Sequence, residues 1–65
     1  MCESTVWLLK GSERVMIISE AARVIVTGDN VTCIDTFGER KVVPDSRLSE
    51  ANLLGHEILL KERKS

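Results

Sequence analysis

The residues with the clearest capacity for chemistry are the first two, Met1 and Cys2. If Met1 is removed, Cys2 carries a free α-amine and a thiol on adjacent carbons, and these donors close a five-membered chelate ring around a metal ion. If Met1 is retained, its backbone amine, the Cys2 amide nitrogen and the Cys2 sulfur form two fused rings. Either donor set suits a square-planar Ni(II) or Cu(II) ion. The alternative is that Cys2 is an incidental residue at a loose terminus.

The second cysteine, Cys33, lies in a run of residues that is typical of a strand. A free cysteine in that setting behaves as a small buried hydrophobe, so we expect it in the core. No Cys-x-x-Cys spacing is present, which excludes a zinc knuckle. The one histidine, His56, follows Gly55 at an expected hairpin tip, where it is either an ordinary exposed side chain or a further metal ligand.

The sequence offers little to a catalytic mechanism. Its acidic residues show no paired-carboxylate spacing, and a single histidine leaves no Ser-His-Asp triad to nominate. The four glycines are isolated at expected turns and do not form a phosphate-binding loop. We therefore expect that the chain is not an enzyme.

Length and charge restrict the class of protein further. We expect the 65 residues to form one domain, 1–65. The core of so small a domain is marginally stable, and such domains usually need a metal ion or a partner subunit for stability. Nine Lys and Arg residues oppose ten Asp and Glu residues, and there is one Trp, one Phe and no Tyr. Nucleic-acid modules are usually basic and carry stacking aromatics, so a nucleic-acid partner is not expected.

The sequence also indicates where the protein resides. The N-terminus lacks the basic region of a secretory signal, and its apolar run 6–9 is too short for one. Nothing approaches the roughly 20 apolar residues of a membrane-spanning helix. We expect a cytoplasmic protein without membrane contact, whose cysteines stay reduced.

Turn-forming residues divide the chain into short segments rich in β-branched residues. They predict strands at 5–10, 14–19, 23–27, 31–37, 40–43, 47–54 and 57–62. The stretch 19–22 is the only helix-permissive one, with room for one turn at most. The pattern predicts an all-β fold, a small barrel-like (SH3- or OB-like) meander of six or seven short strands.

Strand periodicity and turn chemistry give two finer expectations. Residues Val31, Cys33, Asp35 and Phe37 alternate along one segment, which predicts that they share one face. Gly55 is expected to supply the positive φ of the last hairpin, as glycine and asparagine do in tight turns.

Several segments, taken in order, match a known family. They are the Met1-Cys2 start, the strand 5–9, the run 24–26 with the turn 28–31, the motif Asp35-Thr36-Phe37-Gly38-Glu39, and the segment 52–60 around Leu54-Gly55-His56. With these features the chain resembles the CooT family of small nickel-binding proteins, named for the maturation of carbon monoxide dehydrogenase. Hydrogenase-maturation chaperones of the HypC type also begin Met-Cys, but their Cys-x-Ala-x-Pro-Gly continuation is absent, since Glu3-Ser4-Thr5-Val6 follows Cys2.

The resemblance implies a small β-barrel-like protein, often dimeric, that binds Ni(II) through Cys2 and assists nickel delivery to a metalloenzyme such as carbon monoxide dehydrogenase. Met1 would add its backbone amine if retained. Some family members carry the label of RNA-binding protein, so the alternative is a protein- or RNA-interaction module without a metal role.

The donor count predicts the oligomeric state. One chain supplies two or three donors at Met1 and Cys2, whereas a square-planar ion takes four. Two chains that meet at their N-termini supply two sulfurs and two nitrogens. We therefore expect a homodimer with a shared metal near its two-fold axis, and the apolar segment 7–9 is a candidate part of the interface.

Overall fold

A computed structural model describes residues 3–63, and within that range the fold is all-β with no helix. It has six strands, which confirms the predicted fold class. Their bounds are β1 (Ser4–Lys10), β2 (Glu13–Thr27), β3 (Asn30–Asp35), β4 (Arg40–Val43), β5 (Ser46–Asn52) and β6 (Glu57–Glu62).

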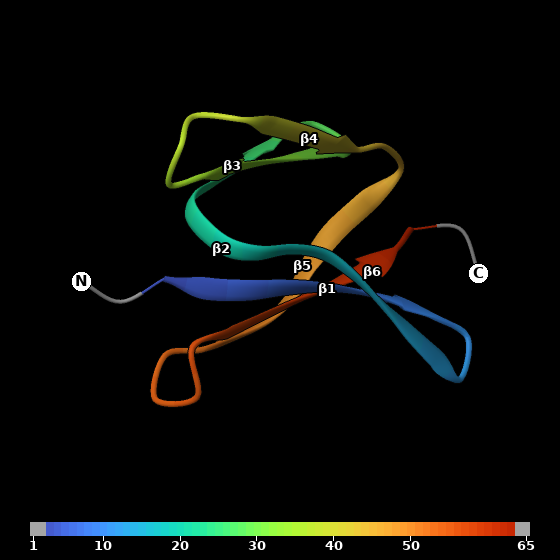
Figure 1. Ribbon diagram of the computed structural model, residues 1–65. Coiled ribbons are helices and arrows are strands. Elements are labelled where there is room, and N and C mark those ends of the chain that lie inside the picture. Colours follow the sequence, from blue (N-terminus) through green and yellow to red (C-terminus); the bar gives the residue numbers. More distant parts are fainter. Residues whose placement is uncertain (1–2, 64–65) are drawn as a thin grey trace.

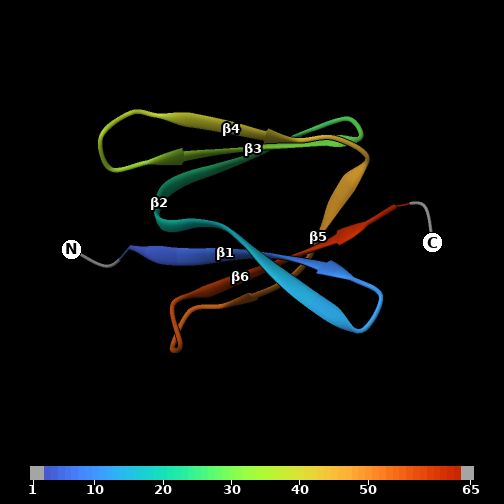
Figure 2. The same cartoon turned by 45° about the vertical axis from the view of Figure 1, so that its right-hand side comes forward.

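The six strands form one sheet in the order β4-β3-β2-β1-β6-β5. All neighbours are antiparallel except β1 and β6, which run parallel and join the start of the chain to its end. Figures 1 and 2 show how the sheet curls: β3 and β4 lie over β1, β6 and β5, and β2 connects the two layers. The result is a half-barrel whose hollow holds the core, as the barrel-like prediction anticipated.

Strand β2 is continuous where the sequence predicted two strands and a helix-permissive interruption at 19–22. Its first part pairs with β1 and its second part with β3, and Ala21 is the residue that pairs with both Ser4 and Asp35. Register shifts flank this position, and an extra residue in one strand bends it and increases its twist. The small side chain of Ala21 is buried at the bend, so the interruption is a corner within one strand.

The core lies in the hollow of the curled sheet. Val6 and Leu8 point into it from β1, and their parallel partners Ile58 and Leu60 lie beside them in β6. The upper layer closes the core with three further buried side chains, Val31, Cys33 and Val43. Alternation along each strand places these residues on the inner face, as the period of two requires.

The two-residue turns follow the predicted chemistry. Lys10 pairs with Glu13 and Thr27 pairs with Asn30, so Gly11-Ser12 and Gly28-Asp29 are the turns between them. In each turn only the glycine, at the first central position, has a positive φ. This is the pattern of the type II′ turn, whose twist matches that of the flanking strands.

Phe37 departs from its predicted position on the inner face of β3. The strand ends at Asp35, and the next residues form a loop instead of continuing the alternation. The Asp35 carboxylate accepts hydrogen bonds from the backbone amides of Phe37 (2.9 Å) and Glu39 (2.8 Å), and Gly38 has a φ of 89°. The Phe37 side chain is consequently 90% exposed.

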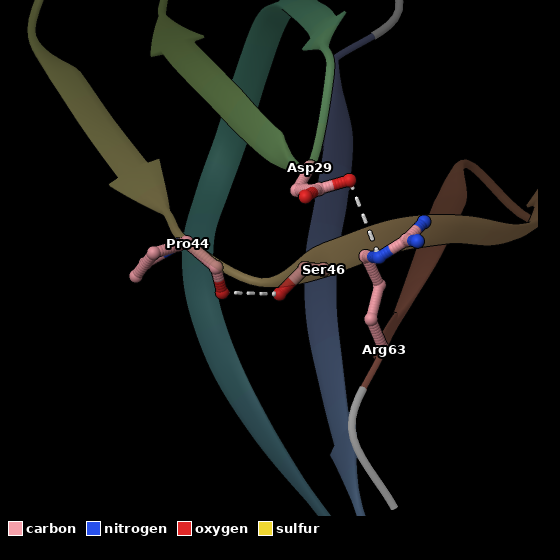
Figure 3. Close-up of polar contacts among 4 residues, drawn as sticks. All are labelled: Asp29, Pro44, Ser46 and Arg63. Carbon is pink, nitrogen blue, oxygen red and sulfur yellow. Dashed lines mark hydrogen bonds and ion pairs between the residues drawn. The ribbon is translucent and has the colours of Figure 1, made fainter.

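A group of polar contacts joins the two layers at the end of the molecule opposite the start of β1 (Figure 3). The backbone amide of Ser46 donates to the carbonyl of Asp29 at 2.8 Å, and the Arg63 amide donates to the carbonyl of Asp45 at 2.8 Å. The Ser46 hydroxyl, almost fully buried, donates to the carbonyl of Pro44 at 3.0 Å. The Arg63–Asp29 ion pair (3.3 Å) is exposed and contributes little stability.

Candidate metal site

Met1 and Cys2, the predicted metal ligands, lie outside the described residues. The structure describes the residues around the start of β1, which follows them in the sequence. Strand β1 begins at Ser4, which pairs with Ala21 of β2 on one side. On the other side Thr5 pairs with Glu57 of β6. The Thr5 hydroxyl also donates to the carbonyl of Ser19 at 3.2 Å. The first described residues are therefore anchored between two neighbouring strands.

His56 lies beside this entry point. Its backbone carbonyl accepts a hydrogen bond from the Thr5 amide at 2.9 Å, just before the parallel pairing of β1 and β6 begins. Its side chain is exposed. The parallel arrangement thus brings the histidine, far from Cys2 in the sequence, next to the segment that leads to Cys2.

The turn that holds His56 differs from the predicted one. The positive φ belongs to His56 itself, at 56°, and not to Gly55. Gly55 lies close to the Asn52 side chain: its amide donates to Asn52 Oδ1 at 2.9 Å, and a Cβ there would lie 3.1 Å from Asn52 Nδ2. The glycine therefore permits close approach of the Asn52 side chain.

Cys33 is fully buried in the core, as predicted. Desolvation raises the pKa of its thiol above the ordinary value of 9.0, because burial disfavours the thiolate. The thiolate is the form that binds metals, so this cysteine is a poor ligand. Its neighbours in the core are apolar side chains, and it serves packing.

No group of three or more His, Cys, Asp or Glu side chains within residues 3–63 is arranged to hold a metal ion. Two of the acidic residues have other contacts: Asp35 organises the β3–β4 loop, and Asp29 pairs with Arg63.

Three large apolar side chains are exposed at the end of the molecule where β1 begins. Phe37 lies in the β3–β4 loop, 90% exposed, and Leu53 and Leu54 lie in the β5–β6 turn, 76% and 96% exposed. Both loops lie toward the same end as the N-terminus in the two views (Figures 1 and 2). The sequence alone did not place these residues at one end, because the two loops belong to different layers and share that end only through the folding of the sheet.

The segment 7–9 is divided between the two faces of the sheet. Leu8 is in the core, whereas Trp7 lies on the outer face opposite Met16 and Leu59. The Arg14 guanidinium lies 4.6 Å from the centre of the Trp7 ring, a cation–π contact. Trp7 Nε1 is buried with no hydrogen-bond partner among the described residues. The apolar part of this segment that a partner chain can reach is therefore small.

None of the described residues forms a helix of the length and apolarity needed to cross a membrane.

Comparison with known proteins connects this geometry to a family. The model of the family described as "CO dehydrogenase accessory protein CooT" matches residues 1–61. The fold is similar to that of a candidate CooT from Carboxydothermus hydrogenoformans, with a TM-score of 0.83 and 24% sequence identity over 94% of this chain and 97% of the other. No curated protein matches the sequence. The family match includes both Cys2 and His56.

Proposed function

The chain belongs to the CooT family of carbon monoxide dehydrogenase accessory proteins, and from this premise we propose that it binds Ni(II) through Cys2 and assists nickel delivery to that class of enzyme. The accessory role itself comes from the family match, which covers residues 1–61. Nickel is the cargo in this proposal.

The burial of Cys33 is the observation that carries the proposal. A soft divalent metal prefers thiolate ligands, and the chain has two cysteines. Cys33 has no exposed surface, and burial keeps its thiol protonated. Cys2 is therefore the cysteine that supports a thiolate site, and it can supply backbone nitrogen donors in the same chelate rings.

Titration with Ni(II), followed by absorption spectroscopy and calorimetry, tests the assignment. The wild-type protein is expected to develop thiolate-to-nickel charge-transfer bands, and Cys2→Ser is expected to lose them together with the affinity. Cys33→Val is the matched control, because it removes the other thiol and keeps an apolar core residue. Equal nickel binding by Cys2→Ser and the wild type would refute the role of Cys2.

We further propose that two copies of the chain associate at the end where β1 begins and share the metal near the two-fold axis. The donor count supports this, since Met1 and Cys2 of one chain leave at least one position of a square-planar ion open. The exposed Phe37, Leu53 and Leu54 supply apolar surface at the same end. Native mass spectrometry is expected to show a dimer with one nickel ion; a nickel-loaded monomer would contradict the shared site.

A further inference from the structure

A row of basic side chains crosses the outer face of the sheet near the end of β1. Leu9 of β1 pairs with Arg14 of β2 on one side and with Lys61 of β6 on the other. Lys61 pairs in turn with Arg47 of β5. The residues that precede Leu9 and Lys61 are both buried in the core. Successive side chains point to opposite faces, so Arg14, Lys61 and Arg47, the basic row, point outward.

The charges of the basic row are not neutralised within the described part of the chain. All three side chains are exposed, and none forms an ion pair with another residue of the range 3–63. Lys61 and Arg47 lie directly opposite each other, and like charges in that arrangement destabilise a sheet. Glu50, in the neighbouring row opposite Leu59, forms no ion pair with either of them. Relief of this repulsion favours the binding of an anionic partner.

The residues beside the basic row favour a protein as that partner over a nucleic acid. Met16, 50% exposed, and the half-buried Trp7 pair with each other in the next row. Arginine, methionine and tryptophan are all enriched in interfaces between proteins. A nucleic-acid base stacks on a free aromatic face, whereas the Arg14 guanidinium already lies 4.6 Å from the centre of the Trp7 ring.

On these observations we propose that the basic row docks an acidic surface of the carbon monoxide dehydrogenase that this accessory protein serves. The inference rests on the proposed function and adds the surface and the chemistry of the contact. Arg14 and Arg47 can each bind a carboxylate through two parallel hydrogen bonds, and Lys61 adds a further positive charge. Complementary charges also accelerate the encounter and fix the relative orientation of the two proteins.

The basic row lies within reach of the end of the sheet where β1 begins. Thr5 and Leu9 lie on the same outer face, four residues apart in one strand. That separation is about 13 Å, at about 3.3 Å per residue. An interface of standard size buries about 800 Å² on each partner, a patch roughly 30 Å across. An enzyme docked on the basic row therefore also covers the start of β1.

Reversal of two charges tests the proposal. Arg47→Glu combined with Lys61→Glu is expected to weaken binding to purified, nickel-free carbon monoxide dehydrogenase from the same organism at least about tenfold in biolayer interferometry. Wild-type binding should also weaken as salt is added, because salt screens exposed charges. Arg47→Lys combined with Lys61→Arg keeps both charges and should bind within a few fold of the wild type.

The matched control reverses two charges on the other layer. Arg23 and Arg40 are exposed, lie on either side of Ile34 in the sheet, and form no ion pair with a described residue. Arg23→Glu combined with Arg40→Glu changes the net charge by the same amount and should bind the enzyme as the wild type does. Equal losses in the two double reversals would overturn the proposal, because overall charge would then explain the binding.

A single reversal separates docking from a structural role. Lys61→Glu places a carboxylate opposite Arg47, so it should raise the thermal unfolding temperature while it weakens enzyme binding. A variant that binds poorly because it is damaged shows the opposite change in stability. A lower unfolding temperature of Lys61→Glu would overturn the argument that Lys61 and Arg47 repel each other.

The remaining outcomes distinguish the docking proposal from its rivals. If the wild type does not bind the enzyme, or binds it no better than the Arg47→Glu, Lys61→Glu variant, the basic row is not its docking surface. If that variant loses binding only to a labelled single-stranded RNA, the row belongs to a nucleic-acid interface instead. Nickel titration of the variant should match the wild type, since neither residue is a proposed ligand. A wild type that docks through the row and binds no nickel would refute the proposed function alone.

Discussion

Asp35 and Glu39 hold each other through two reciprocal hydrogen bonds. The Asp35 amide donates to the Glu39 carbonyl at 2.9 Å, and the Glu39 amide donates to the Asp35 carboxylate at 2.8 Å. This pair closes the loop between β3 and β4 and leaves Phe37 projecting from it. The Asp-Thr-Phe-Gly-Glu motif is therefore a loop-forming element that presents one aromatic side chain.

Asp35→Ala should destabilise the protein by about 1–3 kcal/mol, because it removes the acceptor of two backbone amides. Asp35→Asn keeps one carbonyl oxygen and should lose less. Urea denaturation of both variants and the wild type measures the difference. An unfolding midpoint of Asp35→Ala equal to that of the wild type would show that the carboxylate is dispensable for the loop.

Phe37→Ser should weaken the proposed dimer and leave the fold intact. The side chain is 90% exposed, so its replacement should change the free energy of unfolding of one chain by no more than about 0.5 kcal/mol. Sedimentation equilibrium with and without Ni(II) should show a shift toward monomer. Val26→Ser, 52% exposed in β2 near the opposite end, is the control and should stay dimeric. If the two variants associate equally, the end of the molecule that carries Phe37 is not the interface.

Gly55→Ala should destabilise the β5–β6 turn by about 1 kcal/mol, since the added Cβ would lie 3.1 Å from the Asn52 side chain. In an Asn52→Ala background the crowding is gone, and Gly55→Ala should be neutral or stabilising because it restricts the unfolded chain. A double-mutant cycle by thermal unfolding measures this coupling. Additive effects of the two substitutions would contradict the contact.

Stability should fall at alkaline pH through Cys33. Burial raises the pKa of this thiol above 9.0, the value at which the unfolded chain ionises. The neutral thiol therefore contributes stability that is fully present below pH 9.0 and is lost as the pH rises through the higher pKa of the folded state. Urea denaturation of the wild type and Cys33→Val can be compared between about pH 7 and about pH 10. The free energy of unfolding should decline more steeply with pH in the wild type. Parallel curves would mean that Cys33 does not ionise differently on unfolding.

Nickel affinity should fall as the pH is lowered. A free cysteine thiol is mostly protonated at neutral pH, so Ni(II) must displace at least one proton to bind the Cys2 thiolate. The apparent binding constant should drop by at least about tenfold per pH unit below neutrality. Calorimetry in buffers of different ionisation enthalpy counts the protons released, with Cys2→Ser as the control. Binding that releases no proton would exclude a thiolate ligand at that position.

The sequence by itself determined the class of fold and the residue on which the proposed chemistry depends. Turn residues spaced along β-branched runs predicted the strand 40–43 and the hairpin turns at Gly11 and Gly28, because these signals are local and have a period of two. The same alternation placed Cys33 in the core. Chelate chemistry directed attention to Met1 and Cys2 without reference to any fold.

Tertiary structure decided the relations that connect distant residues. Strand β2 bends at Ala21, where it pairs with Ser4 of β1 and with Asp35 of β3. These partners are distant in the sequence, so no local sequence pattern predicts the bend. The position of Phe37 depended on where pairing stops, since alternation continues only as long as a strand has a partner. Above all, the parallel pairing of β1 with β6 places His56 beside Thr5. Parallel pairs join segments that no turn connects, so only the folded sheet reveals them.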